Sequence, residues 1–201
     1  MIKTIINLVL VGIIAALAYM LINSIREPIE FKAELSKREN AVVEKLMAIR
    51  QLQDAHRTIT GMYADNFDSL FHVLRTDSFM EVAVIGDPDD PDFDGTITYD
   101  TTWIKAIDSL RGMGYDPEKL DELRYVPFSD PEGSVVFDIS ADTIIYQKTP
   151  NVPVVMVGAR YRDFMGMYKD PKYAKYNNSY DPNEMLKFGD LGAPNTSGNW
   201  E

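Results

Sequence analysis

A run of aspartates over residues 87–95, DPDDPDFDG, carries the most specific chemical pattern in the sequence. Asp90, Asp92 and Asp94, followed by Gly95, match the start of a calcium loop of the form D-x-D-x-D-G-x-I. In such a loop alternating carboxylates converge on one cation, and the glycine permits a sharp turn. The pattern therefore predicts a calcium site whose side-chain ligands are these three aspartates.

The rest of the loop departs from that pattern. Thr96 can supply a backbone carbonyl, but the twelfth position is Thr101 instead of a glutamate, which removes two oxygen ligands. The flanking residues also resemble strands, whereas an EF-hand loop lies between two helices. The alternative is a solvated acidic hairpin loop without a bound ion, and we expect no cofactor other than this possible calcium.

Other residue types that carry chemistry are sparse. His56 and His72 are the only histidines and lie apart on predicted helices, where structural or surface roles are usual. The chain has no cysteine, which excludes disulfides, thiolate metal sites and cysteine nucleophiles. It also contains no GxSxG, GxxxxGK[ST] or HExxH motif. We therefore expect no catalytic residues and no enzyme.

The charge of the chain also limits its partners. With 31 acidic and 20 basic residues, the formal net charge is −11. Nucleic acids and anionic lipid surfaces are poor partners for so acidic a protein. The soluble part of the chain, beyond the apolar run described next and its flank, has about 170 residues, which is enough for one compact domain.

An unbroken apolar run, IINLVLVGIIAALAYMLI, occupies residues 5–22. At about 1.5 Å per residue, a helix of this length just reaches across a hydrocarbon core of about 30 Å. The alternative is a secretory signal cleaved after Ala18, where residues 16–18 fit a small-x-small site. Because the apolar residues continue past that site, we favour a transmembrane anchor with its flank over residues 1–27.

The orientation of the anchor follows from two opposing arguments. Lys3 precedes the span, whereas more basic residues follow it, so the positive-inside rule favours a cytoplasmic domain. The leading tail is very short, however, and resembles the n-region of an uncleaved signal anchor in front of a large domain. We therefore expect a single-pass protein of the bacterial inner membrane with a periplasmic domain. The basic residues after the span are Arg26, Lys32, Lys37 and Arg38.

Residues 28–62 are expected to form a membrane-proximal stalk helix. Pro28 can break or kink the helix that leaves the membrane, so that a new helix starts there. Apolar residues then recur at helical spacing between charged ones. We expect this stripe to pack on the chain's own domain or on a partner, and we assign it as the candidate interaction site: Leu35, Val42, Leu46 and Ile49.

The fold class predicted for the chain is α+β, with a small antiparallel-sheet domain over residues 63–160. Gly61 is expected to end the stalk helix, and Asp65 to cap a short helix whose apolar face enters the core. We expect strands over 80–85 and 96–101, a helix over 104–113, and a meander of strands over 134–139, 143–147 and 152–157. Residues 161–201 form a loop-rich, tyrosine-containing segment packed on this domain, with one short helix near 182–187.

The order of these elements resembles known families. The span, the long helix and the segment YADNFDSL over 63–70 resemble a type IV pilin or pseudopilin, although a prepilin glycine cleavage site is missing. The segments REPIEF, LRYVPFS and GNWE resemble recurrent segments of a family of uncharacterised bacterial single-span envelope proteins. The layout is also similar to inner-membrane platform subunits of type II secretion and type IV pilus machines.

These resemblances imply an anchored envelope domain and no catalytic residue. We expect a structural or assembly subunit of a secretion or pilus-like envelope machine that acts by protein–protein interaction. Its partners would be the bilayer, through residues 5–22, and other envelope proteins or copies of itself. The alternative is an anchored domain that binds a ligand or calcium.

Overall fold

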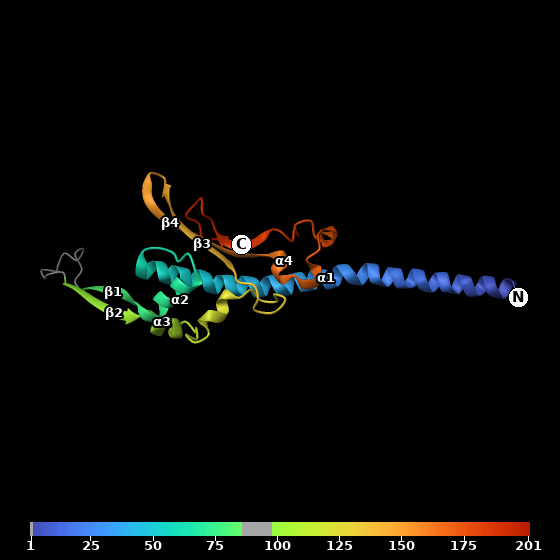
Figure 1. Cartoon of the computed structure of the whole chain (residues 1–201), viewed down its shortest axis with the longest axis horizontal. Coiled ribbons are helices and arrows are strands. Elements are labelled where there is room, and N and C mark those ends of the chain that lie inside the picture. Colours follow the sequence, from blue (N-terminus) through green and yellow to red (C-terminus); the bar gives the residue numbers. More distant parts are fainter. Residues whose placement is uncertain (1, 86–97) are drawn as a thin grey trace, which may run out of the picture.

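One long helix forms the spine of the molecule. The computed structural model describes residues 2–85 and 98–201, and in it α1 (Ile2–Thr60) is a single helix of 59 residues. Figure 1 shows the rest of the chain gathered around the second half of α1, while its first half extends bare from the body. The bare part is long and apolar enough to cross a membrane, and none of it is buried inside the described structure.

The expected break at Pro28 is wrong, because α1 continues through this residue. A proline inside a helix costs about 3 kcal/mol or more, since it removes one hydrogen bond and crowds the preceding turn. Contacts on both sides of Pro28 offset this cost. Tyr176 donates a 2.6 Å hydrogen bond to Glu27, and the ring of Phe31 is fully buried. The boundary expected between residues 27 and 28 therefore falls within one helix.

The end of α1 and the start of α2 (Phe67–Thr76) follow local rules. Gly61 adopts a φ of 82° and donates its N–H to the Arg57 carbonyl at 2.7 Å, as a helix-ending glycine does. The N-cap of α2 is Asn66 and not the expected Asp65, because the Asn66 side chain accepts the bond from the Ser69 N–H. The apolar face of α2 is buried as expected: Phe67, Leu70, Phe71 and Leu74.

The larger sheet has three antiparallel strands in the order β3 (Asp138–Tyr146), β4 (Thr149–Arg160) and β5 (Met185–Gly189). The expected separate strands 134–139 and 143–147 are wrong, since β3 runs through the Ala-Asp pair between them. The turn comes later, at Gln147 and Lys148. Both have positive φ, as a two-residue type I′ hairpin turn requires.

The expected helix near 182–187 is also wrong, because this stretch enters strand β5. Pairing with β4 aligns Val157 with Phe188, and Leu186 and Phe188 are both buried. Gly189 closes the strand with a φ of 79°. A Cβ atom there would overlap the Val155 carbonyl oxygen, so the close approach of β5 to β4 requires glycine.

The smaller sheet is a two-stranded antiparallel hairpin of β1 (Ser78–Ile85) and β2 (Thr98–Lys105). We call it the arm. The helix after it, α3 (Ala106–Gly112), starts later than expected because strand pairing continues to Lys105, opposite Ser78. Figure 1 shows the arm at the end of the molecule opposite the N-terminus.

One short helix, η1 (Leu120–Arg124), precedes the larger sheet. The C-terminal segment folds back on α1 through three more, which follow β4: α4 (Tyr161–Phe164), η2 (Gly166–Tyr168) and η3 (Pro171–Tyr176). The Phe31 ring lies 5.1–6.0 Å from four tyrosine rings of this segment. Farther along, Arg50 pairs with Glu201 at 2.7 Å. The body is therefore fastened to α1 over much of its length.

Candidate interaction surface

The predicted interaction stripe of α1 lies inside the protein's own core. Leu35, Val42, Leu46 and Ile49 are 0–7 % exposed and belong to the same buried cluster as α2 and the larger sheet. The stripe thus packs on the chain's own domain, one of the two alternatives open from the sequence. In the folded chain these four side chains offer no surface to a partner.

The predicted calcium ligands, Asp90, Asp92, Asp94 and Thr96, lie outside the described residues, so calcium binding stays a prediction from the sequence. Within residues 2–85 and 98–201, no group of three acidic, histidine or cysteine side chains is placed to hold a metal ion. His56 is a buried residue of α1, and its Nδ1 lies 2.8 Å from the carbonyl oxygen of Met62. This contact ties the end of the helix to the loop that follows it.

Two hollows on the body bring polar groups together. One, of about 290 Å³, is lined by two bases and two acids that balance each other: Arg162, Lys169, Asp130 and Asp163. The other is a broad groove of about 620 Å³ between α1 and the foot of the arm, lined by Ala55, Phe79 and Met113 among others.

The arm, in contrast, exposes apolar side chains in an ordered pattern. Met80 pairs across the hairpin with Trp103, and Val82 pairs with Thr101. Because side chains alternate between the two faces of a strand, these residues share one face with Tyr99. Their exposed fractions are large: 60 % for Met80, 43 % for Val82, 67 % for Tyr99 and 65 % for Trp103. We call these four residues the apolar face of the arm.

The opposite face of the arm has another character. Its pairs are Phe79 with Ile104 at the foot, then Glu81 with Thr102, then Ala83 with Asp100. Phe79 is half-buried in the groove beside α1, whereas the pairs beyond it are exposed and mostly polar. The foot therefore attaches the arm to the body, and none of residues 2–85 and 98–201 covers the apolar face.

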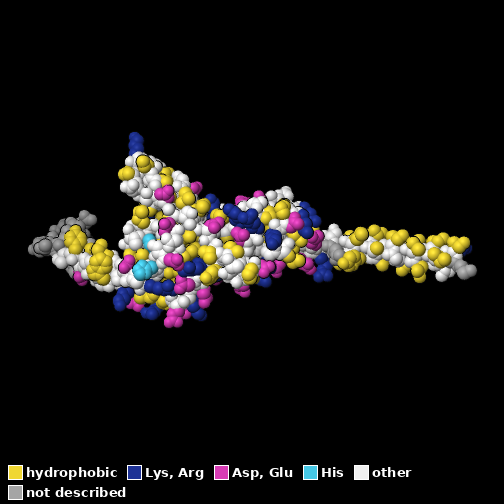
Figure 2. Space-filling model, viewed as in Figure 1, with side chains coloured by type: hydrophobic (Ala, Val, Ile, Leu, Met, Phe, Trp, Pro, Cys, Tyr) yellow, Lys and Arg dark blue, Asp and Glu magenta, His cyan; other side chains and the backbone are white. Residues whose placement is uncertain are grey.

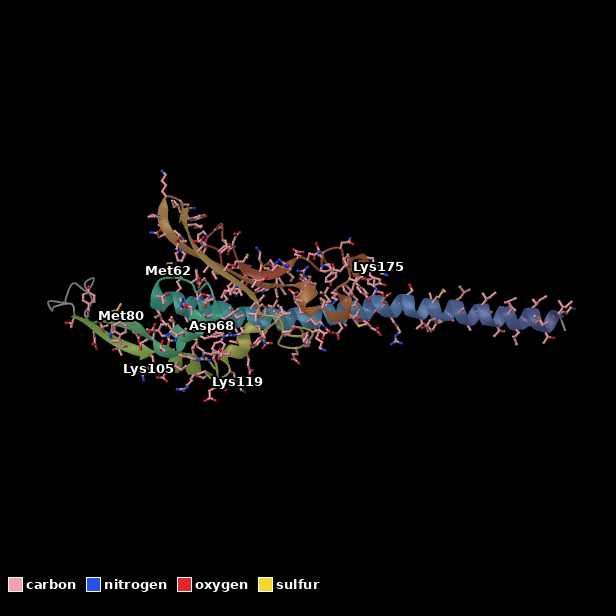
Figure 3. All side chains as sticks on the ribbon, in the orientation of Figure 1. Met62, Asp68, Met80, Lys105, Lys119 and Lys175 are labelled. Carbon is pink, nitrogen blue, oxygen red and sulfur yellow. The ribbon has the colours of Figure 1, made fainter. Side chains whose placement is uncertain are left out.

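A two-stranded hairpin is marginal in water unless a third strand or a helix covers it. Within the described residues, β1 and β2 form a sheet of two strands only, so each strand has one outer edge without a neighbouring strand. Figure 2 shows hydrophobic side chains on the arm and along the bare part of α1, and Figure 3 places Met80 and Lys105 on the arm. Contiguous exposed apolar residues mark interaction sites in soluble domains.

The spacing of apolar residues in β1 and β2 is a sequence signal for this surface. Met80 and Val82 lie two residues apart on either side of Glu81, and Tyr99 and Trp103 lie four apart, so each pair falls on one face of a strand. Such a pattern is usually explained by a core beneath the apolar face, and only the structure shows that nothing in the described chain lies there.

The continuous helix separates this surface widely from the apolar run. From Ile22 to the last residue of α1 at Thr60, the helix rises by about 57 Å at ~1.5 Å per residue. The arm attaches beside this far end, where β1 contacts α1 and Phe79 lines the same groove as Ala55 and Thr58. Comparison with known proteins adds no assignment, since no protein-family model, curated protein or solved structure matches the chain.

Proposed function

We propose that this protein is a membrane-anchored structural or assembly subunit of a bacterial envelope machine, and that it acts by protein–protein interaction. The first part of α1 would lie in the inner membrane and the body in the periplasm. The observation that carries the proposal is the uncovered apolar face of the arm, held at the far end of the helix that bears the anchor.

The exposure of the bare helix supports the anchor. Side chains around its whole circumference are exposed, for example Leu8 at 75 %, Val11 at 65 % and Leu17 at 60 %. Exposed leucine and valine on every side of a helix suit a hydrocarbon solvent and are costly in water. Only one apolar face would be needed if this part packed against a soluble body.

Contacts between α1 and the C-terminal segment support a fixed spacing between membrane and arm. The Arg38 guanidinium donates a 2.6 Å hydrogen bond to the Phe164 carbonyl, and Tyr161 donates a 2.8 Å bond to Glu39. Phe31 is stacked on Tyr173 nearer the membrane. These contacts join α1 to the body at several heights, so the arm is presented by a stiff rod and not by a flexible tether.

The test compares two variants on one strand. Trp103→Lys places a charge on the apolar face, whereas Thr102→Lys places the same charge on the polar face one residue earlier. The full-length protein is solubilised from its native membrane and its assembly mass is measured. We expect the unaltered protein to run as a complex larger than the monomer. Trp103→Lys should disrupt this complex, and Thr102→Lys should preserve it. A monomer in every sample, or a complex indifferent to Trp103→Lys, would refute the proposal.

The anchor is tested separately. The mature protein should retain the apolar run, so sequencing of its N-terminus should not begin at Tyr19, directly after the possible cleavage site. A reporter that is active only in the periplasm, fused after Glu201, should be active. Activity of a cytoplasm-dependent reporter alone would reverse the proposed orientation.

A further inference from the structure

The end of the body nearest the apolar run lies close to where the proposed anchor would leave a bilayer. We infer that this end is a lipid-contact surface, where Lys175 and Arg26 bind the phosphates of zwitterionic phospholipid headgroups. This inference rests on the proposed anchor and goes beyond the proposed function, since it adds the bilayer surface as a partner of the body.

The position of η3 along α1 sets its height above the membrane. Tyr176 of η3 donates a 2.6 Å hydrogen bond to Glu27, which follows the end of the apolar run at Ile22 by five residues. At ~1.5 Å per residue, Glu27 lies about 7.5 Å beyond the run. A bilayer has about 30 Å of hydrocarbon within a total of about 40–45 Å, so each headgroup layer is about 5–7.5 Å thick. The end of η3 therefore reaches the headgroup layer.

The helix holds η3 at this height. α1 continues without a break through Pro28, and the ring of Phe31 stacks on Tyr173 of η3 with centroids 5.5 Å apart. Figure 1 shows the body beginning where the bare part of α1 ends, and Figure 3 places Lys175 at this end of the body. Because η3 is fastened to a continuous helix, it keeps its distance from the apolar run.

The stretch of α1 just after the apolar run exposes further apolar side chains. Ile25 is 56 % exposed and Ile29 is 61 % exposed. Such side chains are costly in water and are stabilised where acyl chains meet headgroups. Tyrosines such as Tyr176 are also enriched at this level of a membrane, because they combine an apolar ring with a polar hydroxyl. The composition of this end suits the boundary of a bilayer.

The charged groups at this end leave hydrogen-bond donors free for phosphate. Glu30 pairs with Arg26 at 3.0 Å, but the Arg26 side chain is still 68 % exposed and has five N–H donors. Lys175 is exposed, and its ammonium lies 4.5 Å from the centre of the Tyr176 ring. Among the described residues no carboxylate forms an ion pair with Lys175. Phosphate oxygens accept strong hydrogen bonds from both kinds of cation.

The balance of charge around η3 favours zwitterionic lipid. Lys172 lies 3.9 Å from Asp170, so basic and acidic side chains are equally represented here: Arg26, Lys172 and Lys175 beside Glu27, Glu30 and Asp170. A zwitterionic headgroup offers its phosphate to the cations and its positive group to the acids. An anionic surface offers no such match, and the net charge of −11 opposes it.

The height of η3 is measured by fluorescence quenching. Because the chain has no cysteine, one introduced cysteine can carry a label in the full-length protein. The label is placed at Asn178, which is exposed and follows η3, or at Lys119, which Figure 3 places on the body away from the bare helix. The vesicles are phosphatidylcholine with a nitroxide on some headgroups. We expect strong quenching at position 178 and little at position 119.

A label at Ala18 separates this inference from the anchor on which it rests. Nitroxides on the acyl chains should quench a label at this position, inside the apolar run. If position 18 is not quenched, the proposed anchor fails. If position 18 is quenched and position 178 is not, the body stands clear of the headgroups, and only the inference is overturned.

Acylation of lysines tests the contact with phosphate. The unlabelled full-length protein is treated with a water-soluble acylating reagent in phosphatidylcholine bilayers and in a sugar-headgroup detergent without phosphate. Mass spectrometry should show a rate at Lys175 that is lower in bilayers by roughly threefold or more, and a rate at Lys119 that is the same in both. Equal rates at Lys175, or protection that requires anionic lipid, would overturn the inference.

Discussion

The two hairpins of this protein differ in how far their apolar side chains are buried. The hairpin of β3 and β4 gains a third strand, β5, and packs against α1, so Val155, Val157 and Phe188 are at most 1 % exposed. Among the described residues the hairpin of β1 and β2 gains no third strand, and it meets α1 only at its foot; Trp103 is 65 % exposed. The first hairpin is completed by the chain itself, whereas the second leaves apolar surface for something outside the described chain to cover.

The difference directs attention to the arm as the candidate functional surface. Most of the aromatic residues are used within the body, where Phe31 and its tyrosines fasten the C-terminal segment to α1. The arm places Tyr99 and Trp103 in solvent instead. Exposed apolar residues that lie together are typical of interaction sites, which is why the proposed function rests on the arm.

The largest effect is expected in the core beside the completed hairpin. Val42→Glu combined with Ile49→Glu buries two unpaired carboxylates at fully buried positions of α1. Each costs several kcal/mol, and the total stability of a domain is only about 5–15 kcal/mol. We expect loss of the cooperative thermal transition measured by circular dichroism.

The matched control for this double variant has the same charge change and the same seven-residue spacing on the exposed side of α1. Asn40→Glu with Met47→Glu should leave the transition nearly unchanged, because both residues are exposed. If the two double variants melted alike, the buried stripe would not be the core of the body.

A smaller but specific effect is expected where β5 joins the completed hairpin. Gly189→Ala would force a Cβ atom into the Val155 carbonyl oxygen at a position with positive φ. We expect a loss of at least about 2 kcal/mol in the free energy of unfolding, measured with denaturant. Gly192→Ala is the control, since a Cβ there meets only an Asp190 oxygen at 3.4 Å. Equal stability of the two variants would argue against close packing of β5 on β4.

Alkaline pH should loosen the C-terminal segment. Burial, with the charge of Asp181 adding to it, raises the pKa of Tyr180 to about 12 from an ordinary value of 10.0. The unfolded chain therefore loses this proton near pH 10 while the folded chain keeps it. The stabilisation is complete below pH 10 and is lost as pH rises through about 12.

Denaturant unfolding at several pH values checks this expectation. Stability should fall between about pH 10 and 12, and Tyr180→Phe should reduce the slope. The same variant loses the 2.6 Å hydrogen bond that Tyr180 donates to the Tyr168 carbonyl, so its stability at neutral pH should also fall, by about 1 kcal/mol. An unchanged slope would show that Tyr180 is not buried as described.

The smallest effect on stability is expected on the arm. Trp103→Thr replaces one residue with high strand propensity by another and removes a side chain that is mostly in water. The free energy of unfolding of the isolated protein should therefore change by no more than about 0.5 kcal/mol. A loss of several kcal/mol in a denaturant titration would mean that the chain itself covers the apolar face of the arm.

The parts of this fold that were predictable are those set by local pattern. The helical stripe of α1, the apolar face of α2 and the terminating Gly61 follow from spacing and backbone preference. Strand β5 was missed because its state depends on pairing with β4, about thirty residues earlier along the chain. Pro28 was misjudged for a related reason, since Tyr176 and the other contacts that hold the helix there come from the C-terminal segment.

The candidate surface was only half predictable. Strands were expected over 80–85 and 96–101, but Trp103 lay beyond the second of them and joins the strand only in the structure. The spacing of residues shows which side chains share a face of a strand. Whether another part of the chain packs on that face depends on the whole fold. The stripe of Leu35, Val42, Leu46 and Ile49 illustrates the converse, because a pattern that suits a partner interface is buried within the chain.

Hydrogen exchange of the full-length protein, measured in isolated lipid nanodiscs and again in native membranes, tests the central claim most directly. We predict that amides of β3, β4 and β5 are protected in both samples, whereas amides of β1 and β2 exchange quickly in nanodiscs and become protected in native membranes. An arm that is equally protected in isolation, or that stays unprotected in native membranes, would contradict its role as the interaction surface.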